Sequence, residues 1–123
     1  MQRKMEINEV PRIKCEELRQ LIDNGESVVI IDTRKGSGYN AEHIKGAVNI
    51  YYNPSGYQME REMMLSALPL DILLVFYCDC IDDSESALMT LEMMNLGYNT
   101  NSVRALNGGF LRWKELDYPT ESV

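Results

Sequence analysis

Two cysteines separated by one residue mark the strongest candidate for chemistry in this sequence. Cys78 and Cys80 follow an apolar run, Ile72–Tyr77, and precede a segment with helical periodicity that begins near Ser84. A strand that delivers a thiol into a short loop before a helix brings it close to backbone N–H groups and to the positive end of the helix dipole, which stabilise a thiolate. Because the thiolate is the attacking form of cysteine, this arrangement predicts nucleophilic catalysis by Cys78 or Cys80.

The predicted loop is acidic. It carries four carboxylates between positions 79 and 85, and no Lys or Arg occurs between positions 78 and 96. Nearby carboxylates oppose the approach of an anionic substrate and disfavour a thiolate, but they also complement a helix N-terminus, for which Ser84 is a candidate cap. The predicted substrate-binding loop comprises Asp79, Ile81, Asp82, Asp83, Ser84, Glu85 and Ser86.

A second apolar run, Val28–Ile31, also ends in polar residues, Asp32 and Arg34. An acid and a base at a strand end commonly organise neighbouring loops through hydrogen bonds, so we expect a supporting role for this pair. The sequence contains one histidine, His43. Together with the two loop cysteines it would supply only three zinc ligands at tight spacing, so we expect no metal and no other cofactor.

Apolar periodicity predicts alternating strands and helices. The pattern indicates strands at 28–31, 47–50, 72–77 and 103–106, and helices at 15–24, 59–68, 84–96 and after Gly109. Residues 35–38 are expected to form a loop and residues 41–45 a short helical turn. Short strands that alternate with helices define an α/β fold with a mostly parallel central sheet flanked by helices, in which ligands bind beyond the carboxyl ends of the strands.

The same periodicity predicts which helical side chains are buried. In the helix at 84–96 the expected core face comprises Ala87, Leu88, Leu91 and Met94, and Met59 and Met63 are expected to pack into the core from the preceding helix. Arg104 and Arg112 are the basic residues that the topology is expected to place closest to an anion site. Gly108 and Gly109 are expected to adopt positive φ between a strand and a helix.

Composition restricts the function classes. The 123 residues suit one domain, 1–123, and 19 acidic against 12 basic residues give a net charge of −7, which argues against nucleic acid or an anionic membrane as a partner. The longest apolar run, Ile72–Cys78, is far shorter than the roughly 20 residues of a membrane span, and the N-terminus lacks the apolar stretch of a signal peptide. Three cysteines are too few for a disulfide scaffold, so we expect a cytoplasmic protein with reduced thiols.

Several short motifs occur in order along nearly the whole chain. They are Ile13 with Glu16–Leu18, Val28–Arg34, Tyr39 with Glu42–Ile50, Tyr77–Cys78, Leu96–Tyr98, and Leu106–Gly109 with Trp113. In this order they resemble the rhodanese family of sulfurtransferases. The resemblance implies a single rhodanese-like domain that carries sulfane sulfur as a cysteine persulfide, with a small sulfur donor or a protein thiol or persulfide as its partner, and a mainly structural role for His43.

The cysteine loop departs from the usual family pattern, which reads roughly Cys-x-x-Gly-x-Arg-Ser. Here the loop contains no Gly or Arg and is about two residues longer, so it resembles a variant with a Cys-x-Cys motif. Counted from the strand end, Cys78 occupies the catalytic position; counted back from Gly97, Cys80 does. Both stay candidates, and we favour Cys78 because the strand fixes its position.

Three functions follow from these features. The first is a sulfurtransferase or sulfur carrier that acts through a persulfide. The second is a catalytically silent module whose acidic loop binds a cationic or protein partner, since a fold does not by itself define an activity. The third, phosphatase or arsenate reductase chemistry, ranks last because the loop has no Arg to hold an oxyanion.

Overall fold

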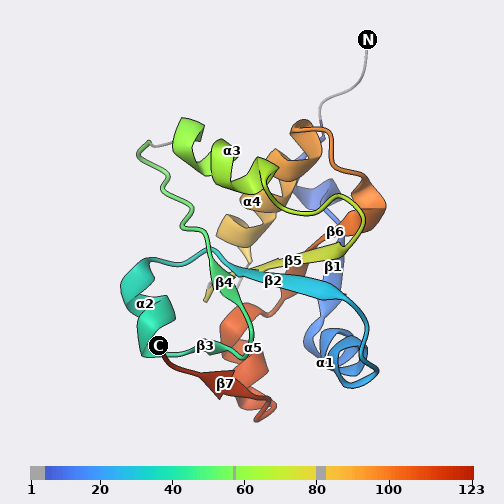
Figure 1. The fold of residues 1–123 in the computed structure, drawn as a ribbon, viewed down its shortest axis with the longest axis vertical. Helices are drawn as coiled ribbons and strands as arrows, with labels where there is room; N and C mark the ends of the chain where they lie inside the picture. Colours follow the sequence, from blue (N-terminus) through green and yellow to red (C-terminus); the bar gives the residue numbers. More distant parts are fainter. Residues whose placement is uncertain (1–4, 57, 80–82) are drawn as a thin grey trace.

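The computed structural model describes residues 5–56, 58–79 and 83–123. At its centre lies a five-stranded parallel sheet in the order β1-β6-β5-β2-β4 (Figure 1). The strands of this sheet are β1 (Arg12–Lys14), β2 (Val28–Asp32), β4 (Val48–Asn49), β5 (Leu73–Tyr77) and β6 (Val103–Asn107). The predicted α/β fold with a mostly parallel central sheet is thereby confirmed.

Helices cover both faces of the sheet. In Figure 1, α3 and α4 lie on one side of the strands, and α1 and α5 lie on the other. The helical segments are η1 (Ile7–Glu9), α1 (Cys15–Asp23), α2 (Gly36–Ala41), α3 (Gln58–Ser66), α4 (Ser84–Asn95), η2 (Thr100–Ser102) and α5 (Gly109–Glu115). Most predicted elements therefore exist, with ends that differ by a few residues.

The central strand β5 shows why the sheet is buried on both faces. Leu74 and Phe76 pack into the cluster formed with α3 and α4, whereas Val75 and Tyr77 pack into the cluster formed with α1 and α5. Successive strand residues point to opposite faces, so a strand covered on both sides must be apolar throughout. The uninterrupted apolar run of the sequence is the consequence.

The structure corrects two predictions in the segment after β2. Residues 36–41 form the helix α2 rather than a loop, and the expected turn at 41–45 contains the strand β3 (His43–Ile44), paired antiparallel with β7 (Thr120–Glu121). Tyr39 explains the helix, because its hydroxyl donates to the carbonyl of Ala47 over 2.7 Å and its ring stacks on His43 at 3.9 Å. These tertiary contacts override the poor helix propensity of a segment with two glycines.

The buried faces of two helices also differ from the prediction. The side of α4 that faces the sheet consists of Ser86, Ala87, Met89, Thr90 and Met93, while the expected Leu88 is exposed. On α3, Met59 and Met63 are 76% and 69% exposed, so they do not pack into the core. The buried residues of α3 are Arg61 and Leu65, and in α4 buried small polar residues alternate with apolar ones, so neither helix has a clear apolar period.

No helix in the described part of the chain is long and apolar enough to cross a membrane.

Candidate active site

Cys78 is the first residue after β5 and lies at the carboxyl end of the sheet. Strand pairing places Tyr77 opposite Asp32, the last residue of β2, so the two predicted polar strand ends are neighbours. The first turn of α5 closes the other side, where the N–H of Phe110 donates to the carbonyl of Cys78 over 2.8 Å. Residues of β2, β5 and α5 therefore meet at this position.

The side chain of Cys78 is fully buried and points to the first turn of α4. Its Sγ lies 3.7 Å from the hydroxyl oxygen of Ser86. The same hydroxyl donates to the carbonyl of Asp83 over 2.9 Å, and the backbone carbonyl of Ser86 accepts from the hydroxyl of Thr90 over 2.7 Å. A row of hydroxyl groups therefore runs from the sulfur along the buried side of α4.

The helix α4 begins at a residue with unusual backbone geometry. Asp83 precedes it with φ 51° and ψ 21°, a left-handed conformation that few residues other than glycine, Asn and Asp adopt. Asp83 is therefore the N-cap residue, and Ser84, which was the predicted cap, is the first residue of the helix. Glu85 lies in the first turn, as expected for an acid that complements the helix dipole.

The carboxylate of Asp83 is buried against a guanidinium from the edge strand. Arg12 Nε lies 3.3 Å from Asp83 Oδ2, and Arg12 Nη2 lies 3.1 Å from Asp83 Oδ1. This two-point pair balances one of the loop carboxylates. No local pattern indicates this pair, because Arg12 and Asp83 are 71 residues apart.

Asp79 faces solvent beside two basic residues. It lines a cavity of about 310 Å³ together with Arg34, Lys35, Tyr51 and Glu85, among others. A second cavity of about 370 Å³ borders Asp79 on the side of α5. Cys78 lines neither cavity, but the surface around its neighbour Asp79, which we call the mouth of the site, carries both signs of charge, whereas the loop sequence alone indicated only negative charge.

The pair Asp32 and Arg34 forms a closed network beneath this mouth. Arg34 Nη2 lies 2.7 Å from Asp32 Oδ2 and 2.6 Å from the carbonyl of Glu42, and the hydroxyl of Tyr77 donates to Asp32 Oδ2 over 2.8 Å. Burial disfavours the charge of Arg34, but the hydrogen bond and charge of Asp32, with smaller contributions from Tyr77 and Asp79, raise its pKa overall. These contacts tie β2 to β5 and to the segment after α2, and they fit the expected supporting role.

His43 is buried away from the cysteine, in the small sheet. Its Nδ1 lies 2.7 Å from the carbonyl of Tyr39, and its Nε2 lies 3.3 Å from the carboxylate of Glu121. The carboxylate of Glu121 also accepts from the N–H of Gly46 over 2.8 Å. The histidine therefore connects α2 and β3 to the C-terminal strand β7, which is a structural arrangement.

The third cysteine, Cys15, is also buried, at the start of α1. Its Sγ lies 3.7 Å from the carbonyl of Asn107 and 3.8 Å from the carbonyl of Gly109. Burial, followed by the charge of Glu16, raises the pKa of Cys15 to about 11. This thiol is neutral near pH 7 and is not a nucleophile.

The two arginines expected near an anion site lie elsewhere. Arg104 donates to the carbonyls of Thr100 and Val103 before and at the start of β6, at the opposite end of the sheet. Arg112 forms exposed ion pairs with Glu16 and Glu115. Chain order does not determine which way an arginine points, so sequence reasoning missed the basic residues that do border the site, Arg12 and Lys35.

Three residues of the predicted loop, Cys80, Ile81 and Asp82, lie outside the described residues. Of the remaining loop positions, the structure brings Asp83 and Ser86 to the buried side near Cys78 and places Asp79 and Glu85 at the mouth. Within residues 5–56, 58–79 and 83–123 no cluster of His, Cys, Asp and Glu is arranged to hold a metal ion.

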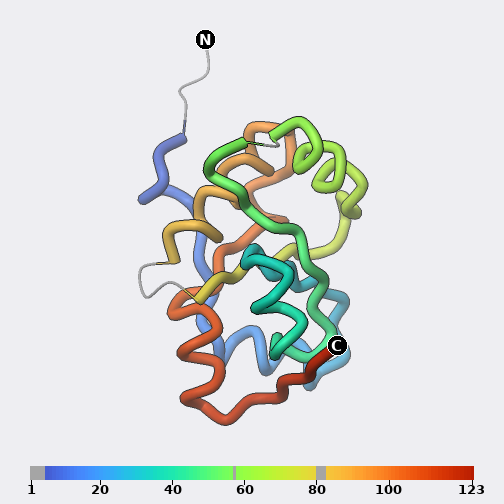
Figure 2. Tube along the Cα trace, turned by 90° about the vertical axis from the view of Figure 1, so that its left-hand side faces the viewer, coloured from blue at the N-terminus to red at the C-terminus, as the bar shows by residue number. Residues whose placement is uncertain are grey.

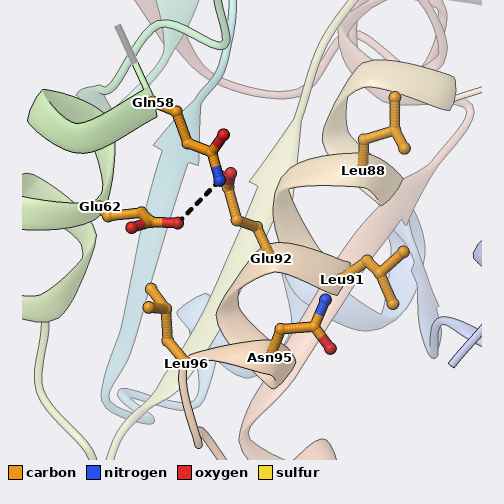
Figure 3. A pocket seen from close by; sticks show the side chains of 7 residues that line it. All are labelled: Gln58, Glu62, Leu88, Leu91, Glu92, Asn95 and Leu96. Atoms are coloured by element: carbon orange, nitrogen blue, oxygen red, sulfur yellow. Dashed lines mark hydrogen bonds between the residues drawn. The ribbon is translucent and has the colours of Figure 1, made fainter. Parts of the chain in front are cut away.

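A separate groove lies between α3 and α4, with a volume of about 270 Å³ (Figure 3). Gln58 and Glu62 point into it from α3, and their side chains are joined by a hydrogen bond of 3.0 Å. The residues that line it from α4 and its end are Leu88, Leu91, Glu92, Asn95 and Leu96. It includes neither Cys78 nor Ser86, so it is not part of the cysteine site.

The sequence profile of the family described as "Rhodanese-like domain" matches residues 14–116. The chain therefore belongs to the rhodanese-like domain family, as the motif order predicted. No curated protein sequence matches the chain significantly.

Solved structures agree with this assignment. The rhodanese-like domain of a protein from an Anabaena species is 26% identical, with a TM-score of 0.71, over 97% of this chain and 81% of that one. A rhodanese-related protein from Thermoplasma volcanium is 20% identical, with a TM-score of 0.71, over 90% of this chain and 97% of that one. The thiosulfate sulfurtransferase of Pseudomonas aeruginosa has a TM-score of 0.75 at 23% identity, over 94% of this chain but only 21% of that one.

Proposed function

We propose that this protein transfers sulfane sulfur through a persulfide on a cysteine of the loop that follows β5. The position of Cys78 carries the proposal: it follows the central strand directly, and its sulfur faces the first turn of α4. In parallel α/β sheets this edge is where ligands bind and where helix N-termini favour anions. Membership of the rhodanese-like family supports the same chemistry.

The proposed reaction has two displacement steps. The cysteine thiolate attacks the outer sulfur of a donor, and a new S–S bond gives the persulfide anion Cys–S–S⁻. The bond between that sulfur and the rest of the donor breaks, and its electron pair leaves with sulfite or a thiolate. An acceptor thiolate then attacks the outer sulfur of the persulfide, and the cysteine thiolate leaves. Both steps move one sulfur atom without a net oxidant or reductant, which is consistent with a protein that needs no cofactor.

The charge distribution favours a neutral or protein-bound donor over a small anion. Asp79 and Glu85 line the entrance, and carboxylates there repel an anion such as thiosulfate. Arg34 and Lys35 line the same cavity; Arg34 is already paired with Asp32, whereas Lys35 can pair with one anionic group of a larger donor. We therefore infer a thiol persulfide, either small or on a protein, as the donor class, because its reacting sulfur group carries at most one negative charge whereas thiosulfate carries two.

One observation favours a second function. The side chain of Cys78 is fully buried, and a buried thiol cannot attack a substrate until the site opens. A catalytically silent domain that binds a partner through its acidic loop would have the same burial. The two functions differ in whether the protein takes up sulfur at all.

Intact-protein mass spectrometry after incubation with thiosulfate, polysulfide or a persulfide donor distinguishes them. We expect the parent to gain one sulfur atom, and Cys15→Ala to gain it equally, because Cys15 lies in a separate buried position. The variants Cys78→Ser and Cys80→Ser identify the nucleophile, since only loss of the reacting thiol abolishes uptake.

Thermal melting of each variant shows that it is folded under the assay conditions. Uptake that persists in the double variant Cys78→Ser/Cys80→Ser would refute the proposed site. A folded parent that takes up no sulfur from any of the three donors would refute sulfur transfer and leave the binding module.

A further inference from the structure

A buried ion pair joins the edge of the sheet to the end of the cysteine loop. Arg12, on β1, contacts both carboxylate oxygens of Asp83, over 3.1 Å and 3.3 Å, and the side chain of Asp83 is 9% exposed. Arg12 lies N-terminal to residues 14–116, which match the family profile. The contact joins residues that are 71 positions apart and ties the edge strand β1 to the end of the cysteine loop.

The guanidinium of Arg12 is fixed from a second side. Its Nη1 donates to the carbonyl of Ile7 over 2.9 Å and to the carbonyl of Val10 over 2.7 Å. Figure 2 shows this N-terminal segment running beside the start of α4, and Val10 packs against Ala87 of that helix. Because all three nitrogens are engaged, Arg12 presents a rigid fork to Asp83.

The ion pair holds Asp83 in a conformation that its own backbone disfavours. The φ of 51° lies in the left-handed region, where a side chain with a Cβ crowds the following carbonyl. Such conformations persist where the surrounding contacts enforce them, and they concentrate at functional sites. Here the two-point pair with Arg12 holds the side chain of Asp83, and the N–H of Ala87, which donates to the Asp83 carbonyl over 2.9 Å, holds its backbone.

The backbone of Asp83 in turn orients the group that faces Cys78. The carbonyl of Asp83 accepts from the hydroxyl of Ser86 over 2.9 Å, and the oxygen of that hydroxyl lies 3.7 Å from Cys78 Sγ. A serine hydroxyl has one proton, so while it is donated to Asp83 the oxygen offers the sulfur a lone pair and accepts from the thiol. The Asp83 carbonyl, which also accepts from the N–H of Ala87, therefore fixes the position from which the Ser86 hydroxyl accepts from the thiol or turns to donate to a sulfur anion.

We propose that Arg12 is a positioning residue for sulfur loading: by clamping Asp83 in its left-handed conformation, it sets the start of α4 and the hydroxyl of Ser86 against Cys78. This rests on the proposed function and deepens it. Arg12 acts through Asp83 and Ser86 and does not itself touch the sulfur. Its loss leaves a buried carboxylate without its cation, and the loop end must rearrange to reach solvent.

Arg12→Met tests the proposal, with Arg61→Met as the matched control. Arg61 forms a two-point pair of similar geometry, 2.7 Å and 2.8 Å, with Glu92 on the same helix α4, but away from Cys78, and the side chain of Arg61 is more buried than that of Arg12. We expect both variants to lower the melting temperature. At a temperature well below either transition, only Arg12→Met should slow persulfide loading, by about tenfold or more, since small displacements at a reacting centre are costly.

Rescue separates positioning from a general loss of stability. Arg12→Lys keeps the charge but not the fork, and should restore part of the loading rate. In Arg12→Met/Asp83→Asn the unpaired charge is gone and an asparagine tolerates the left-handed backbone, so loading should return to within about threefold of the parent. This double variant also keeps the test valid if Arg12→Met alone does not fold.

Two results would overturn the proposal. One is a loading rate in folded Arg12→Met no slower than in Arg61→Met. The other is a double variant that recovers its melting temperature but not its loading rate. The rate of iodoacetamide labelling of each loop cysteine, resolved by peptide mapping, is a second readout that needs no sulfur transfer. A labelling rate that changes in Arg12→Met but not in Arg61→Met supports positioning even if the parent takes up no sulfur.

Discussion

The hydroxyl of Tyr77 makes hydrogen bonds that hold both the end of β5 and the network of Asp32 in place. It donates to Asp32 Oδ2 over 2.8 Å and accepts from the N–H of Ile44 over 3.0 Å, in a side chain with no exposed surface. Burial, followed by the charge of Asp32, raises the pKa of Tyr77 far above its ordinary value. The phenol therefore keeps its proton near neutral pH and donates a hydrogen bond to Asp32.

Tyr77→Phe removes this hydroxyl and keeps the ring. A buried N–H left without a partner costs about 1–3 kcal/mol, and a hydrogen bond to a charged group contributes about 1.5–3 kcal/mol. Asp32 keeps its bonds to Arg34, so the second loss lies at the low end, and we expect unfolding free energy to fall by about 3 kcal/mol. For a chain of this length about 4 °C of melting temperature corresponds to 1 kcal/mol, so the midpoint should fall by about 12 °C.

Urea denaturation measures the change, with Tyr39→Phe as the matched control. The hydroxyl of Tyr39 makes one bond, to the carbonyl of Ala47 over 2.7 Å, so its loss should cost only about 1 kcal/mol. The slope of free energy against urea should be unchanged in both variants. A loss in Tyr77→Phe of less than about 1 kcal/mol, or equal to that in Tyr39→Phe, would refute the reasoning.

Two further predictions concern positions outside the cysteine loop. Gly108 has φ +85°, and a Cβ there would lie 2.6 Å from Arg112 Cβ. Gly108→Ala should therefore lower the melting temperature clearly more than Gly25→Ala, where φ is +73° but no atom lies within 4 Å of the added Cβ. Equal losses would contradict the steric argument. The pKa of Cys15, raised to about 11 from 9.0 by burial and then by Glu16, means that the folded thiol keeps its proton after the unfolded one has lost it. The stabilising contribution of Cys15 is therefore complete below pH 9 and is lost as the pH rises toward 11. The difference in unfolding free energy between the parent and Cys15→Ala should shrink over that range by up to about 2 kcal/mol. A constant difference would show that Cys15 does not titrate this way.

The fold was predictable because its main signals are local. The apolar runs at 28–31 and 72–77 and the glycines at 108 and 109, both with positive φ as expected, mark the elements directly. The helix α2 was not predictable, because contacts of Tyr39 with Ala47 and His43 fold a segment of weak helix formers. Its residues have no apolar period of their own.

The site was predictable only in part. Cys78, Asp32 and Arg34 were placed at the correct edge, because strand ends in a parallel sheet lie together. The partner of Asp83 was not, since Arg12 reaches it from the other end of the chain and nothing in its own neighbourhood indicates the direction of its side chain. Which loop cysteine reacts stays a prediction, with Cys80 outside the described residues.

The ion pair between Arg12 and Asp83 reduces the number of loop carboxylates that can repel an anionic donor and slow its reaction. The sequence indicated four loop carboxylates, but Arg12 balances that of Asp83, so the described acids at the entrance are Asp79 and Glu85. Asp79→Asn should therefore raise the rate of loading from thiosulfate, a divalent anion, by about two- to fivefold, because an exposed charge near the entrance acts through a high dielectric and is screened by salt.

The control is Asp71→Asn, which removes the same charge at an exposed position outside both cavities that border Asp79. It should change the rate little, and Asp79→Asn should affect loading from a singly charged persulfide donor less than loading from doubly charged thiosulfate. Added salt should raise the thiosulfate rate of the parent and diminish the advantage of Asp79→Asn, since screening weakens the same repulsion. Thiosulfate loading that is indifferent to both the substitution and the salt would mean that the acidic entrance does not select the donor, and that access to the buried sulfur does.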